Sequence, residues 1–178
     1  MGGKGKRGGI RMILVLVVAV LASGCGYGFR GSVNNLPPDI KAVHIPIFVN
    51  QTNEAGAETI FANALIYEFN RSHILQVVAA AEAQVVIIGK IKSVAIETVT
   101  LASQTQAVDR KVTIVLDVTC QRLDNKKILW QNPALSRYQN YTVSQDHQFL
   151  SDRSKEEAIR KIAQDLSERI HNGILENF

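Results

Sequence analysis

Apolar and polar residues alternate strictly over residues 111–121, which is the clearest pattern in the chain. An alternation of period two predicts a β-strand with one buried face and one open face. A free cysteine in the apolar series behaves as a small hydrophobic residue rather than as a reactive thiol. The expected buried face consists of Val112, Ile114, Leu116, Val118 and Cys120.

Shorter apolar stretches on both sides predict further strands. Pro46 lacks a backbone donor, so its strand is expected at an edge of the sheet or with a bulge. Gly89 predicts a bulge in another strand, where the apolar face changes register. Turn-forming residues at 123–127 predict a hairpin after strand 111–121. The further extended segments are expected over residues 42–49, 74–78, 84–98, 128–130 and 136–143.

Two segments have the periodicity of amphipathic helices. Residues 57–70 place Ile60, Phe61, Ala64, Leu65 and either Tyr67 or Phe69 near i, i+3, i+4 spacing. Ser154 with Glu157 three residues later is a capping-box pattern, so a second helix is expected from Ser154 to about His171. This helix is expected to carry the acid-before-base pairs Glu156–Arg160, Glu157–Lys161 and Asp165–Arg169.

Each predicted helix needs cover for one apolar stripe, and the strands need cover for one apolar face. These requirements predict an α+β fold, a two-layer sandwich of two helices packed on a mixed sheet of four to five strands. The length of 178 residues fits one domain, which we expect to span residues 41–178.

Positive charge is concentrated at the N-terminus. The chain has 20 Lys+Arg and 16 Asp+Glu, and four of the bases stand without an acid before residue 25. Without these four, bases and acids balance at 16 each, so no nucleic-acid partner is expected. The four bases are Lys4, Lys6, Arg7 and Arg11.

Residues 1–24 have the organisation of a secretory signal peptide that is removed. The bases precede an apolar run over residues 12–22, and small residues follow. Eleven apolar residues are too few to cross a bilayer core, which takes roughly 20.

The segment Leu21–Cys25 resembles a bacterial lipobox, with Ala22 at the position where Leu is most common. The resemblance implies that Cys25 is acylated and becomes the mature N-terminus, since several acyl chains give stable membrane attachment. Gly26, in place of an Asp, favours the outer membrane. A soluble periplasmic protein cleaved at another small residue is the alternative. Residues 25–40 are expected to form a lipidated tether or irregular structure lying on the domain.

We expect no enzyme and no cofactor. The four histidines stand far apart in sequence and outside any recognised ligand pattern, so no metal site is expected. Residues 26–31 match a dinucleotide-binding glycine pattern, but no strand precedes them and Pro37 and Pro38 follow. No catalytic residue is therefore assigned.

Basic and aromatic residues supply the binding candidates. Bases near strand ends could bind the phosphates of an anionic glycolipid through charge-assisted hydrogen bonds. Aromatic residues near the hairpin are either packed in the domain or part of a protein interface, where such residues are enriched. The candidate lipopolysaccharide-binding residues are Lys90, Lys92, Arg110 and Lys111, and the candidate interface residues are Trp130, Tyr138 and Tyr141.

Three segments resemble the LptE family of lipopolysaccharide-assembly lipoproteins: residues 25–31 after a signal, Leu36–Pro37, and residues 45–52. The order of strands, hairpin and helix agrees. The resemblance implies two helices on a mostly four-stranded sheet. It also implies an outer-membrane lipoprotein that lies in the lumen of the LptD β-barrel, assists its folding, plugs it and binds lipopolysaccharide.

One position departs from this family. Basic residues in the loop between the two long central strands contact lipopolysaccharide in better-studied members, whereas residues 101–108 here contain no Lys or Arg. The nearest bases are Arg110 and Lys111. Direct lipid binding is therefore a weaker expectation than plug and chaperone function.

Two other classes of function stay open. One is an outer-membrane lipoprotein that activates a periplasmic enzyme or belongs to a secretion complex, and stable association with a β-barrel would distinguish it. The other is an enzyme, which would require a cleft holding two polar groups of shifted pKa.

Overall fold

In the computed structural model, residues 36–101, 107–144 and 148–176 are described, all within one compact unit over residues 33–178. Cys25, the predicted signal peptide and most of the predicted tether lie outside the described residues. Most of the loop over residues 101–108, which contains no Lys or Arg, also lies outside the described residues.

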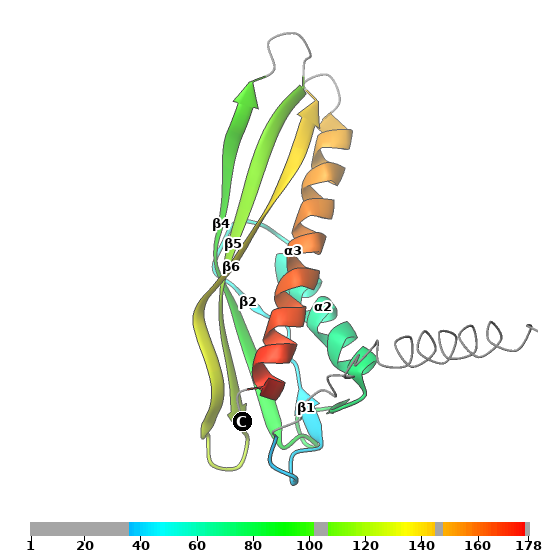
Figure 1. The fold of residues 1–178 in the computed structure, drawn as a ribbon, viewed down its shortest axis with the longest axis vertical. Helices are drawn as coiled ribbons and strands as arrows, with labels where there is room; N and C mark the ends of the chain where they lie inside the picture. The colour runs from blue at the N-terminus through cyan, green and yellow to red at the C-terminus, as the bar shows by residue number, and fades with distance from the viewer. Residues whose placement is uncertain (1–35, 102–106, 145–147, 177–178) are drawn as a thin grey trace, which may run out of the picture. The chain divides into compact units, whose positions relative to one another are not determined.

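Six strands form one mixed sheet, which confirms the predicted fold class with a slightly higher strand count (Figure 1). Its order is β3-β1-β4-β5-β6, and β2 pairs with β4 outside this path. The pairs β1–β3, β1–β4 and β2–β4 are parallel, whereas β4–β5 and β5–β6 are antiparallel. The strands are β1 (Ala42–His44), β2 (Val49–Asn50), β3 (Gln76–Val77), β4 (Val85–Leu101), β5 (Ala107–Arg122) and β6 (Ile128–Ser144).

Two helices, α2 (Ala57–Ser72) and α3 (Gln148–Glu176), cover one face of this sheet (Figure 1). The apolar series of β5 is fully buried beneath them, as its alternation predicts. The same core contains Phe61 and Leu65 of α2 and Ile162 and Leu166 of α3. The domain is therefore a two-layer sandwich with one core.

The first predicted strand is divided in two. Pro46 predicts an edge position or a bulge, and the edge position does not apply to β1, which lies between β3 and β4. The chain leaves the sheet over residues 45–48 and returns as β2, which pairs with β4 further along. Proline cannot donate to a ladder, and at an interior position the ladder is interrupted instead.

The bulge predicted at Gly89 is also wrong. Gly89 lies in regular register opposite Val118, and the register of β4 shifts instead between Ile91 and Ser93 and between Thr98 and Thr100. Glycine is required at position 89 because the ring of Phe48 lies on it. A Cβ atom there would stand 2.2 Å from Cε2 of Phe48.

Helix α2 confirms the prediction for residues 57–70 and runs two residues further. Helix α3 begins at Gln148, so the predicted start at Ser154 is wrong, and it ends at Glu176. No Gly or Pro occurs over residues 148–153, so the helix extends through the capping-box residues.

The predicted pairs along α3 have different outcomes. Glu156 and Arg160 form the expected ion pair. Asp165 instead accepts a hydrogen bond from Nε of Arg137 on β6, at 3.0 Å. Glu157 and Lys161 form no ion pair within the described chain. Asp165 therefore joins the two layers rather than stabilising the helix alone.

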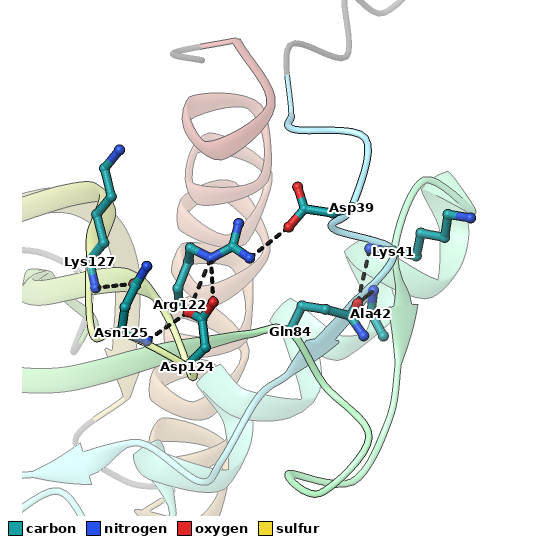
Figure 2. Close-up of polar contacts among 8 residues, drawn as sticks. All are labelled: Asp39, Lys41, Ala42, Gln84, Arg122, Asp124, Asn125 and Lys127. Carbon is teal, nitrogen blue, oxygen red and sulfur yellow. Dashed lines mark hydrogen bonds and ion pairs between the residues drawn. The ribbon is translucent and has the colours of Figure 1, made fainter.

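The described end of the predicted tether lies on the domain, since Leu36 and Ile40 are buried in the core. Asp39 binds Arg122, the last residue of β5, with Nη2 of Arg122 2.6 Å from Oδ2 of Asp39 (Figure 2). The same guanidinium binds Asp124 in the hairpin turn. Oε1 of Gln84 accepts hydrogen bonds from the backbone N–H groups of Lys41 and Ala42 at 3.1 and 2.8 Å. These contacts fix the entry of the chain into the sheet.

Candidate functional site

The face of the sheet opposite the helices carries a patch of small and polar side chains. Residues directly opposite one another in antiparallel strands share a face, so the register assigns three residues each from β4, β5 and β6 to it. All nine are exposed or half-buried, and no helix of the described chain packs on them. This outer patch comprises Ser93, Ala95, Glu97, Lys111, Thr113, Val115, Ser136, Tyr138 and Asn140.

The two charges of the outer patch neutralise each other. Nζ of Lys111 lies 2.8 Å from Oε2 of Glu97 and 5.8 Å from the centre of the Tyr138 ring. The hydrogen bond to Glu97, with its negative charge, raises the pKa of the Lys111 ammonium group. The outer patch is therefore polar but without net charge.

The structure places Arg110 and Lys111 on opposite faces of the sheet. Side chains alternate along a strand, and Arg110 lies opposite Tyr141 on the side of the helices. Arg110 is exposed, and no ion pair joins it to another described residue. The two side chains therefore leave β5 on opposite faces, and only Lys111 belongs to the outer patch.

The other two candidate bases lie further along β4. Lys90 stands opposite Asp117, with 3.8 Å between Nζ and Oδ2. Glu97 lies seven positions after Lys90 along β4, which is roughly 20 Å. Lys92 is exposed at the register shift. The four bases are thus spread along the sheet, and their role in lipid binding stays a prediction.

The three candidate interface aromatics have different environments. Tyr141 is buried beneath α3, and Trp130 is half-buried against Gly173 of α3. Only Tyr138 presents an exposed ring, with 59% of its surface accessible. The predicted interface role applies most directly to Tyr138, and for all three it stays a prediction.

A groove of about 780 Å³ runs between the first turns of α2 and the facing side of α3. Its apolar lining includes Ile60, Tyr67 and Ile159, and Nζ of Lys155 bonds Glu54 at 2.9 Å on its border. Sequence reasoning missed this groove. Of the two aromatics considered for the apolar stripe of α2, Phe69 is buried and Tyr67 is 63% exposed, so Tyr67 is the local signal for the groove.

The residues that the structure describes hold neither a metal-binding cluster nor a reactive thiol. Within the described ranges, no three His, Cys, Asp or Glu side chains stand close enough to hold a metal ion. Cys120 is buried, and burial raises the pKa of its thiol to about 12. Among the helices of the part that the structure describes, none is long and apolar enough to span a membrane.

A solved lipoprotein structure shares the fold. A candidate lipoprotein from Caulobacter crescentus CB15 matches with a TM-score of 0.53 and 10% identity, over 73% of this chain and 87% of that chain. Rare lipoprotein B from Shewanella oneidensis matches with a TM-score of 0.47 and 11% identity, over 75% and 94%. At 10% identity the likeness to the Caulobacter protein concerns the fold alone. No curated protein matches the sequence.

The sequence itself matches a family model over residues 40–174, which includes every strand, all of α2 and all but the last two residues of α3. The family is LptE, described as lipopolysaccharide-assembly. The match covers well over half of the chain. The chain therefore belongs to the LptE family of lipopolysaccharide-assembly proteins.

Proposed function

We propose that this lipopolysaccharide-assembly lipoprotein is anchored in the outer membrane through acylated Cys25. There it partners an LptD-type β-barrel, assists the folding of the barrel and plugs its lumen. Membership of the LptE family supports the assembly role. The lipid anchor rests on the lipobox resemblance of residues 21–25.

The observation that carries the proposal is the outer patch. A sheet face of small and polar residues without net charge is poorly suited to a membrane or to an apolar protein core. The inner wall of a transmembrane β-barrel, however, is polar. A plug in such a lumen needs a surface with hydrogen-bonding groups and few unpaired charges, because desolvating an unpaired charge is costly.

The decisive experiment is a purification of the C-terminally tagged protein from its native outer membrane in mild detergent, followed by gel filtration and mass spectrometry. We expect an LptD-type barrel in about equimolar amount. Recovery of a periplasmic enzyme, a secretion component or no partner would favour the alternative, an outer-membrane lipoprotein with another role.

Two matched variants connect this result to the outer patch. Ser136→Arg places a charge on the patch, whereas Glu168→Arg changes an exposed residue of α3. We expect Ser136→Arg to lower the yield of the barrel several-fold and Glu168→Arg to leave it nearly unchanged. Both positions are exposed, so both variants should fold, which circular dichroism checks.

Direct binding of lipopolysaccharide is the second part of the proposal. Arg110 has no described ion pair and a planar guanidinium that suits phosphate. Lys111 is bound to Glu97, so this ion pair must break before Lys111 can bind a phosphate. We therefore expect Arg110→Ala to weaken binding of purified protein to lipopolysaccharide more than Lys111→Ala does. Unchanged affinity in both variants would remove these residues from the site.

A further inference from the structure

The second half of β4 forms an open edge of the sheet. β1 pairs with Val85 and Val86, and β2 pairs with Lys90 and Ile91. From Ser93 to Thr98, β5 is the one strand of the described chain that pairs with β4, so this stretch borders the sheet (Figure 1). Register shifts bound the stretch at both ends and leave six residues in regular register.

An edge of this kind offers backbone hydrogen-bonding groups. Alternate residues of a border strand direct N–H and C=O groups away from their one neighbour. The side chains are also uncovered. Ile96 lies opposite buried Val112, on the side of the helices, yet 42% of its surface is exposed. No described strand lies beside Ile96 on its open side.

The chain's own β2 cannot extend along this edge. After Asn50 the backbone turns, and the Asn50 side chain fixes the turn with three hydrogen bonds. Oδ1 of Asn50 accepts from N–H and Oγ1 of Thr52 at 2.9 and 2.7 Å, and Nδ2 donates to the carbonyl oxygen of Glu54 at 2.8 Å. Because of this turn, no residue of β2 pairs with β4 beyond Ile91.

A hollow of about 330 Å³ lies where the line of β2 beside β4 would continue. It is bounded on one side by residues 51–54 and on the other by Ser93, Val94 and Ile96. Val94 and Ile96 are apolar, whereas Ser93 and Ala95 of the same stretch are small and belong to the outer patch. An incoming strand would thus meet the apolar Val94 and Ile96 on one face, and small side chains beside the Glu97–Lys111 ion pair on the other.

We propose that an extended segment of a partner protein adds to β4 along Ser93–Thr98, in the line that β2 leaves at Asn50. The edge selects an extended backbone, because its donors and acceptors repeat at the strand spacing. It also selects alternating apolar residues that cover Val94 and Ile96, and it disfavours proline.

The length of the edge argues for a segment rather than for a second copy of this chain. Six residues of strand are about 20 Å long. A stable interface between two proteins buries roughly 1,200–2,000 Å², which so short an edge cannot supply alone. If the partner protein also contacts this domain elsewhere, its segment at the edge needs to supply only part of the buried area of the interface. The inference does not require that this protein be a β-barrel.

Hydrogen exchange tests the proposal on the lipidated protein, compared alone and in the complex purified from its native membrane. We expect peptides that cover Ser93–Thr98 to exchange about tenfold or more slowly in the complex, since strand pairing protects amides. Peptides of residues 112–118, which are paired on both sides, should be protected in both samples. Unchanged exchange at the edge, or recovery of no partner, would overturn the proposal. So would protection of the isolated protein together with a doubled mass, which would indicate pairing of copies.

A pair of variants provides an independent measurement. Ile96→Lys places a charge on the open edge, and Ile128→Lys places one at another exposed isoleucine, on β6. We expect Ile96→Lys to lower partner recovery several-fold and Ile128→Lys to leave it unchanged, with the same urea midpoint in both. Equal recovery from both variants would contradict the proposal. If a β-barrel is recovered but hydrogen exchange at the edge is unchanged, the edge proposal fails and the proposed function stands. If a protein other than a β-barrel protects the edge, the proposed function fails and the edge proposal stands.

Discussion

The ring of Phe48 lies on Gly89, so close that a Cβ atom at position 89 would stand 2.2 Å from Cε2 of the ring. Phe48 belongs to the segment between β1 and β2, and its ring stacks on Phe61 of α2 at 6.0 Å between centroids. Glycine at position 89 thus lets the crossing segment enter the core between sheet and helix.

Replacing Gly89 by Ala should destabilise the domain. Phe48 is 3% exposed and its ring is held by Phe61, so it cannot move away freely. Overpacking of a core typically costs about 1–3 kcal/mol, and we expect a loss of about 2 kcal/mol in the free energy of unfolding in urea.

A double-mutant cycle separates this contact from a general effect of the substitution. In a Phe48→Leu background the ring is absent, so Gly89→Ala should cost less than in the natural chain. Equal costs in both backgrounds would show that the ring is not the cause.

The local periodicity of the sequence predicted the parts of the fold that depend on neighbouring residues. The buried series of β5 and the apolar stripe of α2 needed only the spacing of apolar residues. The role of Gly89 depends on Phe48, which is 41 positions away, and the break at Pro46 depends on β3 occupying the edge beside β1. Neighbouring residues in the sequence carry no information on these distant contacts, so the local pattern could not predict them.

The alternation along the sequence is enough to predict that Arg110 and Lys111 lie on opposite faces of their strand. The apolar series at even positions from Val112 to Cys120 continues to Arg110, and the polar series at odd positions includes Lys111. By that alternation the two bases belong on opposite faces, which the register with β6 confirms. The burial of Tyr141 could not be predicted in this way, because it depends on the register of β6.

Replacing Gly173 by Ala should change the environment of Trp130 with little effect on stability. The new Cβ would lie 2.9 Å from Nε1 and Cζ2 of Trp130, so the indole ring must shift. Alanine in place of glycine stabilises a helix interior by roughly 1 kcal/mol, which offsets much of this strain. Trp130 is the only tryptophan, so its fluorescence should move to longer wavelength as the ring gains exposure. An unchanged spectrum would contradict the contact.

The Asp39–Arg122 contact should make stability depend on pH in the acid range. The hydrogen bond from Arg122 lowers the pKa of Asp39, and that of Asp124, below the ordinary value of 3.8. A carboxyl whose pKa is lowered by folding stabilises the fold above its unfolded pKa, and the effect disappears as the pH falls through the folded pKa. We therefore expect Asp39→Asn to lower the urea midpoint at pH 7 and to match the natural chain well below pH 3.8.

Glu168→Gln is the matched control for this measurement, because Glu168 is an exposed carboxylate of α3 without a described ion pair. Its midpoint should follow that of the natural chain at both pH values. If Asp39→Asn lowered the midpoint equally at both, the charge of Asp39 would not be the cause.

Cys120 should be inert while the domain is folded. Burial raises the pKa of its thiol to about 12, so at pH 8 it carries almost no thiolate, the form that reacts with iodoacetamide. Peptide mass spectrometry can follow Cys120 separately from Cys25. We expect no labelling of Cys120 in native buffer over hours and rapid labelling in concentrated urea. Rapid labelling of the folded protein would mean that β5 opens readily, and the core beneath α3 would then be less stable than its burial indicates.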